Sequence, residues 1–151
     1  MDQAVTNEGA MDSLEQVFER SRAQLFRVLF SFTGGRRDIA DEAVAEAFAR
    51  AIPRYDQIEQ PLPWLYRTAL RYAAKELGRK EPPFDPGVVA DEVEGIQEFV
   101  RLMRTLSPNQ RAAIVLRYEM DLPVKEVAAR LGMSPTTASV HIHRGKKRLQ
   151  G

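Results

Sequence analysis

Apolar residues recur three and four positions apart along most of this chain of 151 residues, which is the spacing of one face of an α-helix. No stretch alternates between apolar and polar residues with the period of a strand, and no segment repeats. Ser13 and Asp38 are the expected N-caps of the first two helices, and Pro53 is expected to end the second in a loop. We therefore predict an all-α protein, with helices over residues 13–32, 38–52, 62–77, 107–118, 124–131 and 135–149 and a helical stretch that resumes at residue 99.

Residues 122–149, LPVKEVAARLGMSPTTASVHIHRGKKRL, have the pattern of a helix-turn-helix. Gly132 can end the first helix in the left-handed conformation, and Ser134 followed by Pro135 can begin the second. The face expected to be buried comprises Ala138, Ile142 and Leu149, with Gly145 allowing close packing. The polar and cationic residues on the other faces fit a helix that enters the DNA major groove. A plain helical hairpin with a solvated basic face is the alternative.

The two halves of the chain differ in charge. Residues 1–96 hold 12 Lys and Arg against 17 Asp and Glu, a net charge of −5, whereas residues 97–151 hold 10 against 4, a net charge of +6. The basic half suits a nucleic acid and the acidic half suits a protein partner. Prolines and acidic residues between 81 and 95 indicate a linker. We expect two small helical domains joined by a flexible linker, divided as a disordered N-terminus (1–12), a helical domain (13–80), the linker (81–96) and a helix-turn-helix domain (97–151).

Four cations follow one another at steps of four residues on the third predicted helix: Arg67, Arg71, Lys75 and Arg79. Residues four apart share one side of a helix, so these side chains should form a cationic ridge. Trp64 and Tyr66 lie at the start of the same helix. Cations interleaved with aromatic rings suit a single nucleic-acid strand, with phosphates on the cations and bases stacked on the rings. The alternative is a solvated charged face beside core aromatics.

Catalytic and metal sites are not indicated. The chain has no cysteine, and its two histidines, His141 and His143, point in nearly opposite directions on a helix, so they cannot share a metal ion. There is no phosphate loop of the GxxxxGK type, no signal peptide and no apolar run long enough to cross a membrane. We therefore expect a cytoplasmic protein that is not an enzyme and needs no cofactor and no metal.

Three stretches together resemble bacterial sigma factors of the extracytoplasmic-function group, the minimal kind with two helical domains. They are DEAVAEAFARAI at residues 41–52, PWLYRTAL at residues 63–70, and LSPNQRAAIVLRYEMDLPVKEVAARLGMSPTTASVHIHRGKKRL at residues 106–149. The resemblance implies reversible binding to core RNA polymerase through its clamp helices, recognition of the −35 and −10 promoter elements, and help in opening the duplex. It also implies an anti-sigma factor as partner and a monomer when free, without an appended regulatory domain.

The resemblance assigns three surfaces. Polymerase binding would fall to Asp41, Glu42 and Glu46. The −10 element would be bound by Trp64, Tyr66, Arg67, Arg71, Lys75 and Arg79. The −35 element would be bound by Ser134, Thr136, Thr137, Ser139, His141, Arg144 and Lys147.

Several positions depart from the family pattern. Ala45 stands where the family usually has Gln, Arg71 where it has Asn, and Lys75 where it has Asp. Ser139 and His141 replace longer cations, which should alter the preferred −35 sequence without removing DNA binding.

Two other functions fit the same pattern. One is a conventional helix-turn-helix regulator, which would bind a repeated DNA site tightly as a dimer and without polymerase. The other is a sigma mimic, an interaction protein that occupies an anti-sigma factor. The cations in both domains argue against the mimic. The departures from the family pattern at Ala45, Arg71 and Lys75 leave it as an alternative.

Overall fold

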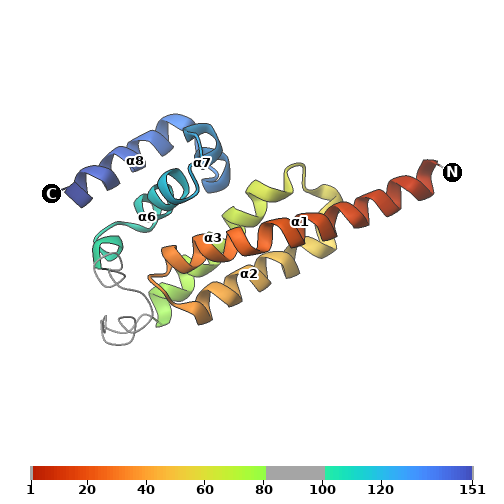
Figure 1. Ribbon diagram of the computed structural model, residues 1–151, viewed down its shortest axis with the longest axis horizontal. Coiled ribbons are helices and arrows are strands. Elements are labelled where there is room, and N and C mark those ends of the chain that lie inside the picture. Colours follow the sequence, from red (N-terminus) through yellow and green to blue (C-terminus); the bar gives the residue numbers. More distant parts are fainter. Residues whose placement is uncertain (1, 81–100, 151) are drawn as a thin grey trace.

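The computed structural model describes residues 2–80 and 101–150, and the side chains of residues 15–79 and 101–150. Every regular element within these ranges is helical, which confirms the all-α prediction. Helices α1, α2 and α3 lie together on one side, and α6, α7 and α8 lie on the other (Figure 1). The predicted linker at residues 81–96 and the helical start at residue 99 lie outside the described residues.

The N-terminal domain consists of α1 (Asp2–Phe32), α2 (Arg37–Ala51), the 3-10 helix η1 (Ile52–Gln57) and α3 (Pro61–Lys80). Its core is formed where α1 and α3 pack on α2. The buried face of α2 is mostly alanine, so the neighbouring helices can approach it closely; it comprises Ile39, Ala40, Ala43, Val44, Ala47, Phe48 and Ala51. Large residues of α1 fill the remaining space, and burying one such side chain contributes about 1.5–3 kcal/mol.

Three details of this domain differ from the prediction. Helix α1 begins at Asp2, so the predicted helix start at Ser13 is wrong. Residues 2–12 contain no proline, which would interrupt a helix. Apolar residues spaced three and four apart indicate a helix face that packs on other helices. The start of α1 extends beyond the other helices, so its sequence need not have this spacing (Figure 1). Asp38 lies inside the first turn of α2 and is not its N-cap, and the loop expected after the helix is η1.

The C-terminal domain contains a helical turn at residues 101–104, then α6 (Pro108–Ile114), the π-helix η2 (Val115–Glu119), α7 (Val124–Leu131) and α8 (Pro135–Gln150). Ser107 and Gln110 form a capping box at the start of α6, in which the N–H of Gln110 donates to the Ser107 hydroxyl at 3.2 Å. The predicted single helix to Tyr118 instead widens after Ile114, because the N–H of Met120 donates to the carbonyl of Val115 at 3.2 Å.

The helix-turn-helix prediction is confirmed. Helix α7 has the predicted bounds, and Gly132 ends it with a left-handed φ of 69°. The N–H of Thr137 donates to the Ser134 hydroxyl at 3.2 Å, so Ser134 does cap α8. Ala138 and Ile142 are buried as predicted, whereas Leu149 is only partly buried. Gly145 does allow close packing, because a Cβ atom placed on it would lie 2.8 Å from Cγ1 of Ile114.

The two domains are in contact, which the expectation of a flexible joint did not include. Helix α7 packs on α3, and η2 packs on α1. The Arg111 side chain is buried, and its Nη1 donates to the carbonyl of Phe32 at 3.1 Å while its Nε donates to the carbonyl of Met103 at 2.9 Å. Arg111 therefore ties the C-terminal end of α1 to the second domain, and the buried residues of both domains form one continuous core.

Candidate nucleic-acid interface

Helix α8 presents the predicted −35 residues to solvent. Six of the seven are exposed: Ser134, Thr136, Thr137, Ser139, Arg144 and Lys147. The buried face of α8 packs on α6 and α7, which fixes the direction of the exposed face. Small polar residues at the start of the helix and cations near its end are arranged as a helix in a major groove requires.

His141 is the exception on this helix. Its side chain is partly buried, and its Nδ1 atom is buried without a hydrogen-bond partner among the described residues. The structure therefore places His141 at the edge of the predicted reading face and not at its centre. Val140, which sequence reasoning missed, is exposed instead. It follows Thr136 by four residues, so helical spacing alone could have placed it on the same face.

Helix α3 presents its predicted −10 residues very differently. Tyr66 is only 1% exposed, and Trp64 packs against the core, so neither ring forms an open stacking surface in this conformation. The guanidinium of Arg130, on α7, lies 5.0 Å from the centre of the Tyr66 ring. Burial raises the pKa of the Tyr66 hydroxyl, and the positive charge of Arg130 opposes that rise.

The cationic ridge on α3 is also divided. Arg67 is partly buried. It lies beneath the turn after α7, where its Cδ is only 2.9 Å from the position that a Cβ atom on Gly132 would occupy. Arg79 forms an ion pair with Glu76 at 3.8 Å. Arg71 and Lys75 are exposed. The predicted ridge is thus present on one helix, but the second domain covers its N-terminal end.

The acidic face of α2 is largely as predicted. Asp41 and Glu42 are exposed, whereas Glu46 forms an ion pair with Arg50 at 2.9 Å. Beside this face lies an apolar groove between α1 and α2, with a volume of about 920 Å³. Ala45 lines the groove, and Ile52, 62% exposed, stands at its edge. Sequence reasoning missed this groove because it assigned the apolar residues of both helices to the core.

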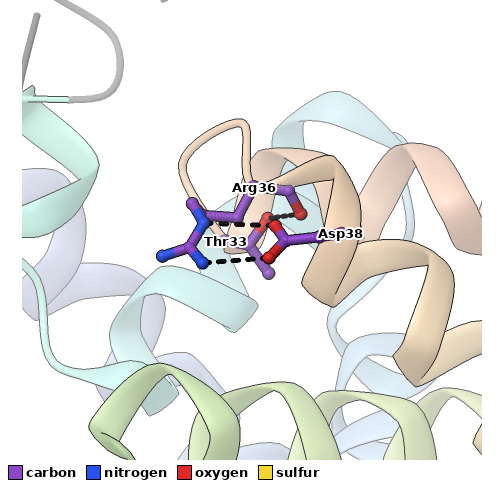
Figure 2. A network of polar contacts seen from close by, with 3 residues as sticks. All are labelled: Thr33, Arg36 and Asp38. Carbon is purple, nitrogen blue, oxygen red and sulfur yellow. Dashed lines mark hydrogen bonds and ion pairs between the residues drawn. The ribbon is translucent and has the colours of Figure 1, made fainter. Parts of the chain in front are cut away.

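The turn that precedes α2 is held by polar contacts (Figure 2). The Thr33 hydroxyl donates to the carbonyl of Phe30 at 3.1 Å and lies 3.3 Å from the carbonyl of Arg36. Two nitrogens of Arg36 donate to the Asp38 carboxylate at 3.2 and 3.0 Å. The hydrogen bond from Arg36 holds the pKa of Asp38 below its usual value of 3.8. These contacts fix the direction in which α2 leaves the turn.

Neither a metal cluster nor a membrane span occurs in the described parts of the chain. No three His, Cys, Asp or Glu side chains at residues 15–79 and 101–150 group as metal ligands. No described helix is both long enough and apolar enough to cross a bilayer.

Comparison with known proteins identifies the two domains. Residues 17–81 match the family described as Sigma-70 region 2, and residues 96–149 match Sigma-70, region 4. The chain is 28% identical over 127 residues to an RNA polymerase sigma-E factor of Streptomyces coelicolor, covering 83% of this chain and 68% of that protein. It is 30% identical over 130 residues to the protein of the same name from Streptomyces antibioticus, covering 83% and 67%. It is 32% identical over 122 residues to that of Streptomyces avermitilis, covering 78% and 63%. The chain thus spans about two thirds of the length of these relatives.

Two solved structures share the fold. CnrH, solved in complex with the cytosolic domain of CnrY, superposes with a TM-score of 0.74 at 22% identity and covers 97% of this chain and 91% of its own. The sigma factor RpoE of Bartonella quintana, solved with the anti-sigma factor NepR, superposes with a TM-score of 0.68 at 20% identity and covers 91% and 94%.

The chain belongs to the sigma-70 family of bacterial transcription initiation factors. Within that family it is a promoter-recognising sigma factor of the extracytoplasmic-function group, with region 2 formed by α1 to α3 and region 4 by α6 to α8. These matches favour the sigma factor over the conventional regulator and over the sigma mimic.

Proposed function

We propose that this sigma factor docks on the clamp helices of core RNA polymerase through α2, reads the −35 element with α8, and holds the separated −10 strand against α3. It would act in the cytoplasm, as a monomer before it joins polymerase. The observation that supports this most directly is the reading face of α8. That face is open to solvent in all its predicted residues except His141, while the opposite face of the same helix is buried.

If α8 reads the −35 element, substitutions at its phosphate contacts and at its base contacts should have different effects on DNA binding. Arg144→Ala should weaken DNA binding by a similar factor on all sequences and lower the salt slope by about 1, as for one lost phosphate contact. Thr137→Val should instead change which −35 sequence is preferred, because a side chain at the start of the helix reaches base edges. Binding of both variants to a −35 sequence library at several salt concentrations measures the two effects. A shift of preference in Arg144→Ala alone would contradict this orientation.

The polymerase surface rests on Asp41 and Glu42 beside the apolar groove of α1 and α2. Reversing such a charge at the rim of an interface lowers mainly the association rate and its salt dependence. Asp41→Arg should therefore slow the association with core polymerase. Glu59→Arg makes the same charge change at an exposed residue outside α2 and should not. Equal effects of the two variants in a binding-kinetics experiment would remove the docking assignment.

Binding of the −10 strand requires the two domains to separate. We call the arrangement in the structure, with α7 packed on α3, the closed arrangement. In it, α7 and the turn after it cover Tyr66 and Arg67, which a single strand must reach. Displacing a base from the duplex costs a few kcal/mol, and docking on polymerase would offset both that cost and the loss of the domain contact. The free protein should accordingly bind duplex promoter DNA poorly.

Permanganate footprinting of the holoenzyme tests this sequence of events. We expect unpaired thymines near −10 with the unchanged protein and their loss in Arg71→Glu/Lys75→Glu. Tight, sequence-specific binding of duplex DNA by the chain alone at physiological salt would favour the conventional regulator.

We also propose an anti-sigma factor as partner. Both solved relatives were captured with a second protein, the cytosolic domain of CnrY in one and the anti-sigma factor NepR in the other. A partner that holds this chain in its closed arrangement would keep Tyr66 and Arg67 covered.

A further inference from the structure

A cavity of about 260 Å³ lies between the two domains. Arg67 and Arg71 of α3 line it from one side, and Arg130 of α7 lines it from the other. Asn109 contributes a polar amide at its edge, the other described residues that line it are apolar, and none of them is acidic. Three arginines from two domains therefore line one cavity, and no described residue of its wall carries a carboxylate.

Arg130 is unusually placed for a charged residue. It is 8% exposed, and its Nη1 donates to Oε2 of Glu126 at 2.9 Å. Its Nε is buried and has no hydrogen-bond partner among the described residues, and the same is true of Nε of Arg67. A buried donor of a charged group costs free energy unless a partner accepts its hydrogen bond. One glutamate beside three arginines leaves this part of the interface positive.

Promoter recognition does not explain the position of Arg130. The residue belongs to α7 and not to the reading helix α8, and it faces α3 in the closed arrangement. The Tyr66 ring accounts for part of its environment, because the ring face attracts the guanidinium. It does not satisfy the buried Nε groups of Arg67 and Arg130.

We propose that this cavity binds a compact anion of the phosphate class, for which inorganic pyrophosphate is the probe. Planar guanidinium groups match phosphate oxygens with paired, charge-assisted hydrogen bonds. The cavity is smaller than the 300 to 1,000 Å³ that is typical of drug-sized ligands, which favours a small ligand of high charge. Because both domains supply arginines, the complete site exists only while the domains are in contact.

A ligand that binds only the closed arrangement stabilises it and opposes the separation that uncovers α3. The anion would therefore act as an inhibitor of the sigma factor. The inhibitory role rests on the proposed −10 function, whereas binding of the anion does not, so the binding test below can succeed where that function fails.

Titration calorimetry of the full chain with pyrophosphate, at constant ionic strength, measures the site. We expect saturable binding of one pyrophosphate per chain at millimolar concentrations or below. Arg71→Gln, which changes an exposed residue and should fold normally, and Arg130→Gln should each weaken binding by about tenfold or more. Lys75→Gln removes the same charge one turn further along α3, outside the cavity, and should change the affinity by less than about twofold.

The result that overturns the proposal is an absence of saturable binding, or an equal loss in Arg71→Gln and Lys75→Gln, which would mean general attraction to positive charge. Acetate at the same ionic strength separates phosphate from carboxylate chemistry, and it should not compete. A phosphate of single-stranded DNA could also enter between the arginines. Distance measurements between labels on the two domains distinguish pyrophosphate from single-stranded DNA. The strand should lengthen the distance, because it binds after the domains separate. Pyrophosphate should favour the closed arrangement, and a shift toward the open one on adding pyrophosphate would contradict the site.

Discussion

The two proposed DNA-binding surfaces of this sigma factor differ in how much of each the free chain exposes. The reading face of α8 is open, and its side chains can be changed with little effect on packing. The face of α3 also carries cations, yet Tyr66 is buried in it and Arg67 lies beneath the turn at Gly132. One surface is open to solvent, whereas the other is part of a domain interface. We therefore propose that contacts between its own domains hold this sigma factor inactive.

The largest effect should come from the aromatic residue that the α3 surface buries. Tyr66→Ala should lower the free energy of unfolding by about 3–5 kcal/mol, because it leaves a cavity in the core. Tyr118→Ala makes the same change at a residue that is half exposed and should cost about 1 kcal/mol or less. Urea unfolding of both variants measures the difference. Equal losses would mean that Tyr66 is not a core residue in solution.

Two glycines provide the next test, and they should act in opposite directions. Gly132→Ala places a methyl group 2.9 Å from Cδ of Arg67 at a residue with a φ of 69°, so it should destabilise the protein by about 1 kcal/mol or more. Gly78→Ala lies in α3 with nothing within 4 Å, and should stabilise the protein by about 0.5–1 kcal/mol. Thermal unfolding of both variants checks the signs. Gly132→Ala with unchanged stability would argue against the close approach of α7 to α3.

The smallest effect should come from the exposed ion pair at the turn before α2. Because Arg36 lowers the pKa of Asp38, the pair stabilises the folded state above the unfolded pKa of about 3.8, and that stability is lost as the pH falls through the lower folded pKa. The carboxylate is largely exposed, so the contribution should be at most about 0.5 kcal/mol. Asp38→Asn should therefore be slightly less stable than the unchanged protein at pH 7, and the difference should vanish below the folded pKa. A difference that grows on acidification would contradict this origin.

The sequence predicted the elements well because their signals are local. Gly132, Ser134 and Pro135 define the turn of the helix-turn-helix through backbone conformation and capping, and the structure has the bounds they indicate. The alanine face of α2 was equally clear. The helical residues 2–12 were missed because their sequence has no periodic apolar face, and the π-helix was missed because nothing in its residues requires the wider turn.

The contact between the domains could not be predicted in this way. The residues that make it, Arg111, Arg130 and Tyr66, are a cation-rich set that composition assigns to solvent or to DNA. Their burial depends on contacts between helices that are far apart in the sequence. It is the reason that Tyr66, expected to be an exposed stacking ring, is buried, whereas the predicted residues of α8 are exposed except His141. The roles of the individual site residues in binding polymerase and promoter stay predictions.

A distance measurement between the domains tests the central claim most directly. The chain has no cysteine, so the substitutions Glu59→Cys and Lys125→Cys, both at exposed residues outside α2, provide the two sites for spin labels. Pulsed electron paramagnetic resonance of the free protein should give one narrow distribution of distances. On binding core RNA polymerase, the distribution should move to longer distances as α7 leaves α3. A broad distribution in the free protein, or an unchanged one on polymerase, would contradict a closed sigma factor that opens to bind its promoter.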